Sequence, residues 1–329
     1  MTAGFLPLDA IGALRTRLAT WLVETPVMRC PNLEKRVRGS TEIYAKLEFL
    51  QQTGSFKPRG ALSVLLGLDA DQLARGVTAV SAGNHAIATA FAARKLGTSA
   101  TVVMPRHASA IRIRACRELG AKLVLADDVH SAFAEAEAIR DKEGRYLVHP
   151  FEGPGTVAGT GTIGLELCDQ LEQFDTVIVP VGGGGLCAGI SAVVKQLRPD
   201  CRIYGVEPTG ADSMHRSFKA SAPVRLEKVN TIADSLGAPY ALPYSYALCK
   251  AFVEDIVLVT DQELRRAMGT LFRELRIAVE PACAASTAAL LGPLSGRQLG
   301  RRVVLILCGS NIDWSTYARD AELGLPRAA

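Results

Sequence analysis

Lys57 has the clearest chemical potential in this chain, because it stands between an aromatic residue and a proline in the segment 54–61 (GSFKPRGA). Proline disfavours the α conformation in the residue before it and is favourable at the first position of a helix. The apolar residues that follow favour a helix, so the pattern predicts Lys57 at a strand-to-helix junction. A partly desolvated lysine would keep its amine neutral there and could attack an aldehyde. Most lysines are solvated, so this hypothesis depends on the other motifs.

Four consecutive glycines lie between a predicted strand and a predicted helix, in the segment 179–186 (VPVGGGGL). Glycine lets consecutive backbone N–H groups converge on one anion, and the helix N-terminus adds partial positive charge. The segment lacks the Gly-Lys-Ser/Thr ending of a nucleotide-hydrolysing loop, which favours the single phosphate of a cofactor. The alternative is a merely flexible loop. The predicted phosphate-binding glycines are Gly182, Gly183, Gly184 and Gly185.

A second glycine pattern, GTGTIG at residues 159–164, matches the dinucleotide-binding string GxGxxG. It does not follow a predicted strand, and no acidic residue ends a strand about 20 residues later, as that fingerprint requires. The pattern therefore predicts close packing between helices.

Two further segments follow predicted strands. Residues 81–85 (SAGNH) open a helix, whose free N–H groups could hold a carboxylate while Asn84 hydrogen-bonds a phenolic oxygen. Ser81 and Asn84 could equally be ordinary helix caps. Residues 308–311 (CGSN) follow the last predicted strand, and the carboxyl ends of parallel strands usually face ligands. An inert buried thiol is the alternative for Cys308.

These segments are positioned by an alternation of short β-branched runs and helical runs, which is typical of a parallel α/β sheet. The predicted strands are residues 42–47, 77–80, 100–104, 122–125, 176–180, 202–207, 256–259 and 303–307. The predicted helices are residues 58–66, 84–96, 108–119, 129–142, 157–171, 186–197, 261–275 and 282–291.

Two polar or Pro/Gly-rich segments, residues 68–76 and 149–156, predict crossings between two domains. The unit between them contains three or four βα repeats. We therefore predict a small domain at residues 70–150, inserted in a large domain formed by residues 1–69 and 151–329.

Composition excludes several classes of function. The chain of 329 residues is 48% apolar and 6% aromatic, with a net charge of +4 and both signs dispersed. No basic run is dense enough for a nucleic-acid partner; Arg112, Arg114 and Arg117 recur at helical spacing and predict a solvated helix face. The eight cysteines form no CxxC pair, which favours a cytoplasmic protein without disulfides or zinc. Neither a signal peptide nor a membrane-spanning helix is predicted.

Taken together, the motifs resemble the pyridoxal-phosphate enzymes of the tryptophan-synthase-β fold, or fold type II. The serine/threonine dehydratases and serine racemases are the most similar group. VEP at residues 279–281 also fits, and the resemblance runs from about residue 24 to about residue 313. It implies a two-domain α/β fold with parallel or mostly parallel open sheets flanked by helices, and with the cofactor between the domains.

The resemblance also implies the roles of individual residues. Lys57 would bind pyridoxal 5′-phosphate as a Schiff base and later take the Cα proton of the substrate. Phe56 would lie beside the pyridine ring, Asn84 would hydrogen-bond the phenolic oxygen, and Cys308 would face the pyridine nitrogen. The phosphate would be bound by Gly182, Gly183, Gly184, Gly185 and Leu186. The substrate carboxylate would be held by Ser81, Ala82, Gly83, Asn84 and His85.

A cation site is a further implication. Glu207, the carbonyl of Ala211 and Ser213 resemble the divalent-metal loop of some relatives. A carboxylate is usual at the position of Ser213 and is missing here, whereas hard cations prefer several charged oxygens. A divalent cation is one hypothesis, and a monovalent cation such as K⁺ or a water molecule is the other.

The activity implied is that of a dehydratase, or ammonia-lyase. It would convert a small, threonine- or serine-like β-hydroxy amino acid to a 2-oxo acid and ammonia by α,β-elimination. Three alternatives stay open: a dehydratase of a dedicated catabolic path (3-hydroxyaspartate, a phenylserine or a hydroxyectoine-derived substrate), an amino-acid racemase, or a non-catalytic amino-acid-binding relative. Ala82 disfavours the racemase, because the racemases carry a serine acid/base there. The resemblance further implies a homodimer without a membrane partner.

Overall fold

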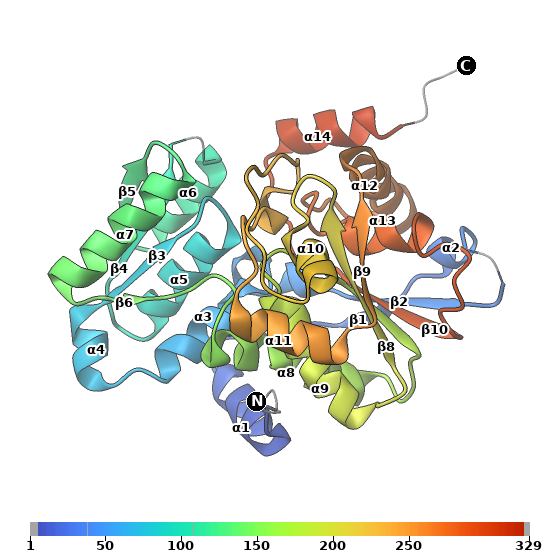
Figure 1. Cartoon of the computed structure of the whole chain (residues 1–329), viewed down its shortest axis with the longest axis horizontal. Coiled ribbons are helices and arrows are strands. Elements are labelled where there is room, and N and C mark those ends of the chain that lie inside the picture. The colour runs from blue at the N-terminus through green and yellow to red at the C-terminus, as the bar shows by residue number, and fades with distance from the viewer. Residues whose placement is uncertain (1–5, 38, 107, 326–329) are drawn as a thin grey trace.

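Two separate β-sheets organise the chain in the computed structural model, which describes residues 6–37, 39–106 and 108–325 (Figure 1). The larger sheet has the strand order β1-β2-β10-β7-β8-β9, and its neighbouring strands are parallel except for β1 and β2. The smaller sheet is parallel throughout, with the order β5-β4-β3-β6. The predicted α/β class with mostly parallel open sheets is therefore confirmed.

The elements agree with most of the predicted ranges within a few residues. The strands are β1 (Val27–Arg29), β2 (Glu42–Lys46), β3 (Val77–Val80), β4 (Ala100–Pro105), β5 (Lys122–Ala126), β6 (Tyr146–Leu147), β7 (Thr176–Pro180), β8 (Arg202–Pro208), β9 (Asp255–Val259) and β10 (Arg302–Ile306). The helices are α1 (Leu8–Leu18), α2 (Pro31–Glu34), α3 (Lys57–Leu66), α4 (Ala70–Arg75), α5 (Asn84–Lys95), α6 (Ala110–Glu118), α7 (Val129–Glu143), α8 (Pro154–Gln170), α9 (Gly185–Leu197), α10 (Ser213–Ala220), α11 (Pro243–Phe252), α12 (Asp261–Leu275), α13 (Ala285–Leu291) and α14 (Trp314–Leu323), with short 3₁₀ turns η1 (Glu48–Leu50), η2 (Gln52–Gly54) and η3 (Asp234–Leu236).

Helices cover both sheets, so the central strands are buried. Strands β3, β4 and β7 are buried along their whole length, as expected for parallel strands with helices on both faces. None of the helices within the described ranges is long and apolar enough to span a membrane.

The GTGTIG segment lies inside α8, where its small residues allow other chains to approach closely. A Cβ atom at Gly159 would overlap the carbonyl oxygen of Arg59 on α3. A Cβ atom at Gly189 on α9 would overlap the hydroxyl of Thr160. The prediction of helix packing at residues 159–164 is therefore confirmed.

Several boundaries differ from the prediction. Residues 68–76 do not form a polar linker, because they contain α4, whose N-terminus is stabilised by reciprocal bonds between Asp69 and Gln72. Helix α8 begins at Pro154, inside the second predicted crossing. The short strands β1 and β6 and the helices α2, α4, α10, α11 and α14 were not predicted.

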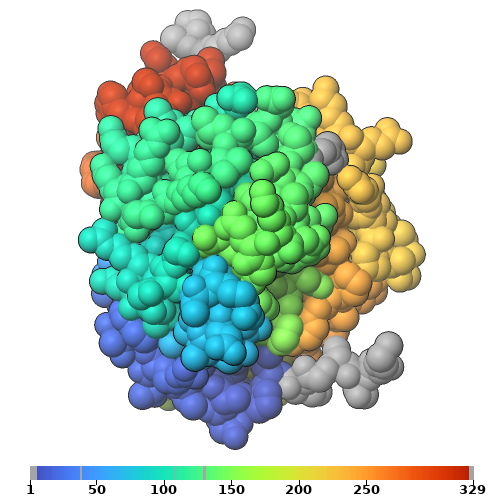
Figure 2. All heavy atoms as spheres, turned by 90° about the vertical axis from the view of Figure 1, so that its left-hand side faces the viewer, coloured from blue at the N-terminus to red at the C-terminus, as the bar shows by residue number. Residues whose placement is uncertain are grey.

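The smaller sheet is built only from residues 77–147. In the sequence, these residues lie between β2 and β7 of the larger sheet. Figure 2 looks onto this part of the molecule, drawn from teal to green, with the segment around residues 215–250 in yellow and orange at its edge. We keep the division into residues 70–150 and the two flanking segments as a proposal.

Candidate active site

A cavity of about 530 Å³ is lined by residues that follow strands of the smaller sheet and by residues that follow strands of the larger sheet. The ends of β3, β4 and β7 reach it through Val80, Pro105 and Pro180, so it lies at the carboxyl ends of parallel strands, where α/β sheets bind ligands. Its lining includes every residue that the sequence predicts for cofactor or substrate binding: Phe56, Lys57, Ser81, Ala82, Gly83, Asn84, His85, Gly182, Gly183, Gly184, Gly185, Leu186 and Cys308.

Lys57 is the first residue of α3, and its amine lies at the cavity wall. The predicted strand-to-helix junction is corrected, because the 3₁₀ turns η1 and η2 lie between β2 and α3. The Nζ atom donates a hydrogen bond of 2.6 Å to the carbonyl oxygen of Pro150 and lies 5.1 Å from the centre of the Phe56 ring. Burial lowers the pKa of Lys57 to about 8. The amine is therefore neutral far more often near neutral pH than a solvated lysine would be.

The four glycines end at the N-terminus of α9 and pack against Phe151. A Cβ atom at Gly183 would overlap the Phe151 ring, and one at Gly185 would overlap the Phe151 carbonyl oxygen. Gly184 has φ of 96°, a left-handed conformation that suits glycine. No described residue accepts a hydrogen bond from the backbone N–H groups of residues 182–186. The loop therefore offers unpaired donors at a helix N-terminus, where an anion is favoured.

Asn84 and Glu280 form another part of the wall. Asn84 Nδ2 donates a hydrogen bond of 2.7 Å to Glu280 Oε1, and Asn311 Nδ2 donates one of 2.7 Å to Asn84 Oδ1. These bonds fix the orientation of the Asn84 amide, whose predicted ligand is a phenolic oxygen. Burial raises the pKa of Glu280.

Cys308 follows β10 and is buried in the same cavity wall. A hydrogen bond with Cys283 and burial raise the pKa of the Cys308 thiol well above its ordinary value. The thiol is therefore neutral at physiological pH, so it could contact a ring nitrogen without adding a negative charge.

The SAGNH segment supplies the N-terminus of α5. The hydroxyl of Ser81 accepts a hydrogen bond of 3.0 Å from the N–H of Gly83. His85 Nε2 lies 2.8 Å from the carbonyl oxygen of Val148, which requires a proton on that nitrogen. Burial lowers the pKa of His85 to about 3, so the imidazole is neutral. A carboxylate bound here would be held by backbone N–H groups and by the helix dipole rather than by an imidazolium.

Arg112 corrects one prediction. Arg114 and Arg117 are exposed as expected, whereas Arg112 is only 4% exposed and lines the cavity. It forms an ion pair with Asp234 and a longer one of 3.4 Å with Glu280. The helical spacing revealed the exposed face of α6, but it could not reveal that one arginine reaches residues more than a hundred positions away.

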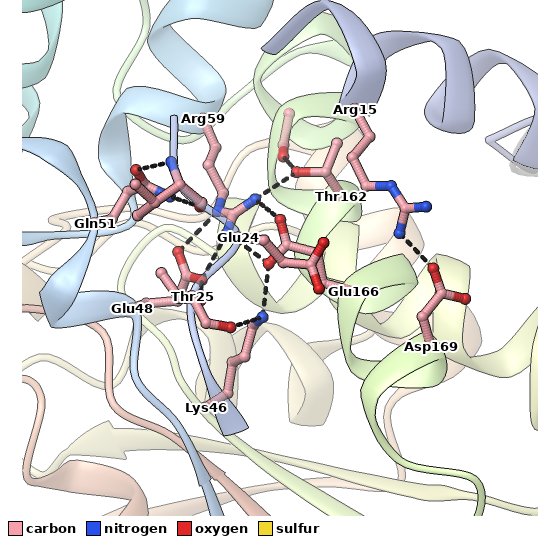
Figure 3. A network of polar contacts seen from close by, with 12 residues as sticks. Arg15, Glu24, Thr25, Lys46, Glu48, Gln51, Arg59, Thr162, Glu166 and Asp169 are labelled. Atoms are coloured by element: carbon pink, nitrogen blue, oxygen red, sulfur yellow. Dashed lines mark hydrogen bonds and ion pairs between the residues drawn. The ribbon is translucent and has the colours of Figure 1, made fainter. Parts of the chain in front are cut away.

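Behind the first turn of α3 lies a buried ionic cluster formed by Lys46, Glu48, Arg59 and Glu166 (Figure 3). The Arg59 guanidinium bonds both oxygens of Glu48, each at 2.8 Å, and both oxygens of Glu166, at 2.6 and 2.8 Å. Lys46 Nζ donates to Glu166 at 2.6 Å. Two cations thus face two carboxylates, and the cluster joins β2, η1, α3 and α8 only two residues from Lys57.

The predicted cation residues lie outside the cavity lining. The Glu207 carboxylate accepts hydrogen bonds from the N–H groups of Met214 and His215, so it caps α10. Burial raises the pKa of Glu207 to about 8. No group of three or more His, Cys, Asp or Glu side chains in the described part of the chain could hold a metal ion. The cation at Glu207, Ala211 and Ser213 stays a prediction.

Comparison with known proteins assigns the family. A family model described as pyridoxal-phosphate dependent enzyme matches residues 19–309. The chain belongs to the pyridoxal-phosphate-dependent enzymes.

Individual relatives narrow this assignment. Phenylserine dehydratase of Ralstonia pickettii is 51% identical to this pyridoxal-phosphate enzyme over 317 residues, which cover 96% of this chain and 97% of that protein. L-threonine ammonia-lyase of Thermotoga maritima is 38% identical over 87% of this chain and 71% of its own length. The structure of maize serine racemase superposes with a TM-score of 0.91 at 32% identity, covering 97% of this chain and 98% of the maize chain. The predicted serine/threonine dehydratase and serine racemase family is therefore confirmed.

The residues around the cavity fit the cofactor that the family requires. The unpaired N–H groups of residues 182–186 suit a phosphate, and the desolvated Lys57 amine suits an aldehyde. When bound, pyridoxal phosphate supplies an electron sink for the bonds at the substrate Cα atom. The chain itself supplies the amine, the phosphate cradle and a neutral thiol at Cys308.

Some cavity residues of this pyridoxal-phosphate enzyme were missed by sequence reasoning. Glu280 was noted only as part of the VEP match, and nothing in its local sequence indicates contact with Asn84. Phe133 and Phe151 also line the cavity. The Pro/Gly-rich context of Phe151 indicated a crossing, but no local signal placed its ring beneath the glycine loop.

The lowered pKa of Lys57 gives a measurable pH dependence. With a pKa of about 8, the amine is neutral in about one molecule in ten at pH 7, roughly 300 times more often than at the ordinary lysine value. In the protein freed of its cofactor, the rate of Lys57 modification by a limiting acylating reagent should rise with pH and level off just above pH 8. Peptide mass spectrometry measures this rate, with peptides containing exposed lysines such as Lys35 as the internal reference. A rate that still rises tenfold per pH unit at pH 9 would contradict the expectation.

Proposed function

We propose that the protein dehydrates a β-hydroxy amino acid that carries an aromatic ring on Cβ, as in phenylserine. The products are the 2-oxo acid and ammonia, because the water lost from Cβ is balanced by the water that hydrolyses the resulting enamine. The relative that is 51% identical over 96% of this chain is a phenylserine dehydratase, whereas the L-threonine ammonia-lyase is 38% identical. The first expectation, a threonine- or serine-like substrate, is thus less well supported than a substrate of a dedicated catabolic path.

The observation that carries the proposal is the chemistry of the cavity wall. The lining includes Phe56, Phe133 and Phe151 and has room for a substituent larger than a methyl group. The cationic side chains among the described lining residues are Lys57 and Arg112, and Arg112 is paired with Asp234 and Glu280. A second carboxylate, as in 3-hydroxyaspartate, would find no unpaired cation, so an uncharged aromatic side chain suits the cavity better.

The proton chemistry supports elimination. Lys57 lines the cavity, and its lowered pKa leaves a neutral amine that could take a proton from Cα. Ala82 also lines the cavity, and its methyl group cannot return a proton from the other face. Dehydration therefore suits this site better than the racemisation performed by the maize relative.

The remaining assignments belong to the same proposal. We assign cofactor binding to Phe56, Lys57, Asn84, residues 182–186 and Cys308, and carboxylate binding to residues 81–85. The eight cysteines are all unpaired thiols, which supports a reducing compartment such as the cytoplasm. A homodimer stays the predicted assembly.

A substrate panel tests the function. Purified protein with pyridoxal phosphate is incubated with threo-phenylserine, L-threonine, L-serine and 3-hydroxyaspartate, and the 2-oxo acids are quantified. We expect kcat/KM for phenylserine to exceed that for each other substrate by at least about tenfold. A buried phenyl ring has the apolar surface of several methylene groups, and each buried methylene group adds to the binding free energy. Faster turnover of threonine or 3-hydroxyaspartate would contradict the proposal. A spectral change without any product would instead indicate a binding protein.

A further inference from the structure

Three aromatic rings form one continuous wall at the cavity. The Phe133 and Tyr240 ring centres are 6.2 Å apart at an interplanar angle of 52°, and those of Phe151 and Tyr240 are 6.0 Å apart at 55°. Phe133 and Phe151 line the cavity, and Tyr240 lies between them next to Pro239, which also lines it. In a chain that is only 6% aromatic, this concentration of rings at one wall points to a specific use.

The two rings of the Phe133–Tyr240 contact come from different parts of the fold. Phe133 belongs to α7, which covers the smaller sheet, whereas Tyr240 lies between η3 and α11 beside the larger one. Figure 2 shows the green α7 region next to the yellow and orange segment that contains residues 220–250. The Phe133–Tyr240 contact therefore closes one side of the cavity between the two sheets.

Both rings are held in place before any ligand binds. Residues 224–226 pair with residues 239–241 through bonds from Leu226 N to Pro239 O, at 2.8 Å, and from Ala241 N to Val224 O, at 3.0 Å. This pairing fixes the backbone of Tyr240. Phe133 packs on an apolar cluster that contains Val80, and it stands in the first turns of a capped helix. Rings that are already ordered lose little conformational entropy on contact with a ligand.

The position of the wall matches where a β-substituent must lie. Val80, a member of the cluster on which Phe133 packs, immediately precedes the SAGNH segment assigned to the substrate carboxylate. Phe151, at the other end of the wall, packs beneath Gly183 and Gly185 of the phosphate loop. An amino acid held between these two segments would have Phe133 and Phe151 of the lining beside it.

We propose that Phe133 is a specificity-determining residue, which contacts the aryl group of the substrate and sets the preference for aryl over alkyl β-hydroxy amino acids. Tyr240 packs against Phe133 and Phe151 outside the lining and is a positioning residue for these rings. This inference rests on the proposed function. Offset or tilted contacts between aromatic rings stabilise a bound ring beyond its buried apolar area. A methyl group in the place of the aryl group would leave the wall uncovered and gain none of these contacts.

The test is the ratio of kcat/KM for phenylserine to kcat/KM for L-threonine, in the holoenzyme. In Phe133→Leu, which keeps an apolar side chain, this ratio should fall at least about tenfold, mainly through a higher KM for phenylserine. Tyr240→Leu should lower it in the same direction. The ratio is independent of the fraction of folded protein, so partial unfolding of a variant cannot mimic the effect.

Phe218→Leu is the matched control. Phe218 faces Tyr246 with ring centres 6.3 Å apart, a separation like that of Phe133 and Tyr240, but neither Phe218 nor Tyr246 lines the cavity, whereas Phe133 does. This variant should keep the wild-type ratio. An unchanged ratio in both Phe133→Leu and Tyr240→Leu would overturn the inference while leaving the dehydratase intact. A wild-type enzyme that does not turn over phenylserine would instead refute the proposed function.

Discussion

Lys57→Ala should lower the rate of 2-oxo acid formation by at least about a thousandfold and leave the fold intact. Removal of a general base alone typically costs a hundred- to ten-thousandfold in rate, and Lys57 is also the amine assigned to covalent cofactor binding. Its burial disfavours the charged amine, so the folded protein loses no favourable ion pair when the side chain is removed. The measurements are kcat on phenylserine and the circular dichroism spectrum.

The proposed covalent bond between Lys57 and the cofactor can be tested separately. Borohydride reduction of the native enzyme should attach the cofactor irreversibly to the peptide that contains Lys57, as measured by mass spectrometry, and Lys57→Ala should not be labelled there. Lys95→Ala is the matched control, because Lys95 Nζ lies 5.5 Å from the Phe91 ring centre but is exposed and outside the cavity. If the Lys57→Ala variant retained borohydride labelling and turnover, another lysine would be the cofactor-binding residue.

Arg59→Met should destabilise the protein by about 3–5 kcal/mol, the usual cost of removing one partner from a buried ion pair. Burial alone would raise the pKa of Glu48, but Arg59, together with Lys46 and Thr25, holds the pKa below its ordinary value. Without the guanidinium, Lys46 would be the cation left among the four cluster residues, facing Glu48 and Glu166. The free energy of unfolding in urea measures the loss.

The cause of that loss can be tested by pH. In Arg59→Met, burial should raise the pKa of the Glu48 carboxylate above its value in the unfolded chain. The folded variant then binds more protons than the unfolded chain, so the deficit against wild type should shrink as the pH falls from about 8 to about 5.5. Arg106→Met is the control, since Arg106 pairs with Asp127 on the surface and should cost about 1 kcal/mol or less. A deficit that is independent of pH would assign the loss to packing instead of charge.

The chemical motifs could be predicted because their function depends on local conformation. The glycine loop and the SAGNH segment each lie between a strand and a helix, whereas Lys57 begins α3 after the 3₁₀ turn η2. The helix start at each of these places is encoded by adjacent residues. Parallel strands end at the same edge of their sheet, which brings together the glycine loop after β7 and Cys308 after β10. The SAGNH segment follows β3 of the other sheet, so its approach depends on how the two sheets are placed. The reciprocal Asp69–Gln72 cap could also have predicted the start of α4. The polar composition of residues 68–76 was interpreted as a linker instead.

The rest of the site depends on contacts between distant residues. Arg112 reaches Asp234 and Glu280, and Phe133 meets Tyr240 over a similar separation in sequence. Helical periodicity identifies which residues share a face, but not which surface that face meets. The short strands β1 and β6 were missed for a related reason, since two or three residues carry no periodic pattern.

Residues 150 and 151 have a further consequence for the site. The carbonyl oxygen of Pro150 accepts the hydrogen bond of Lys57 Nζ, and the ring and carbonyl of Phe151 lie directly beneath the glycine loop. These two residues belong to the connection from the smaller sheet back to the larger one, between β6 and α8. A displacement of this connection would therefore shift the hydrogen-bond acceptor of the Lys57 amine and the packing of the glycine loop at the same time.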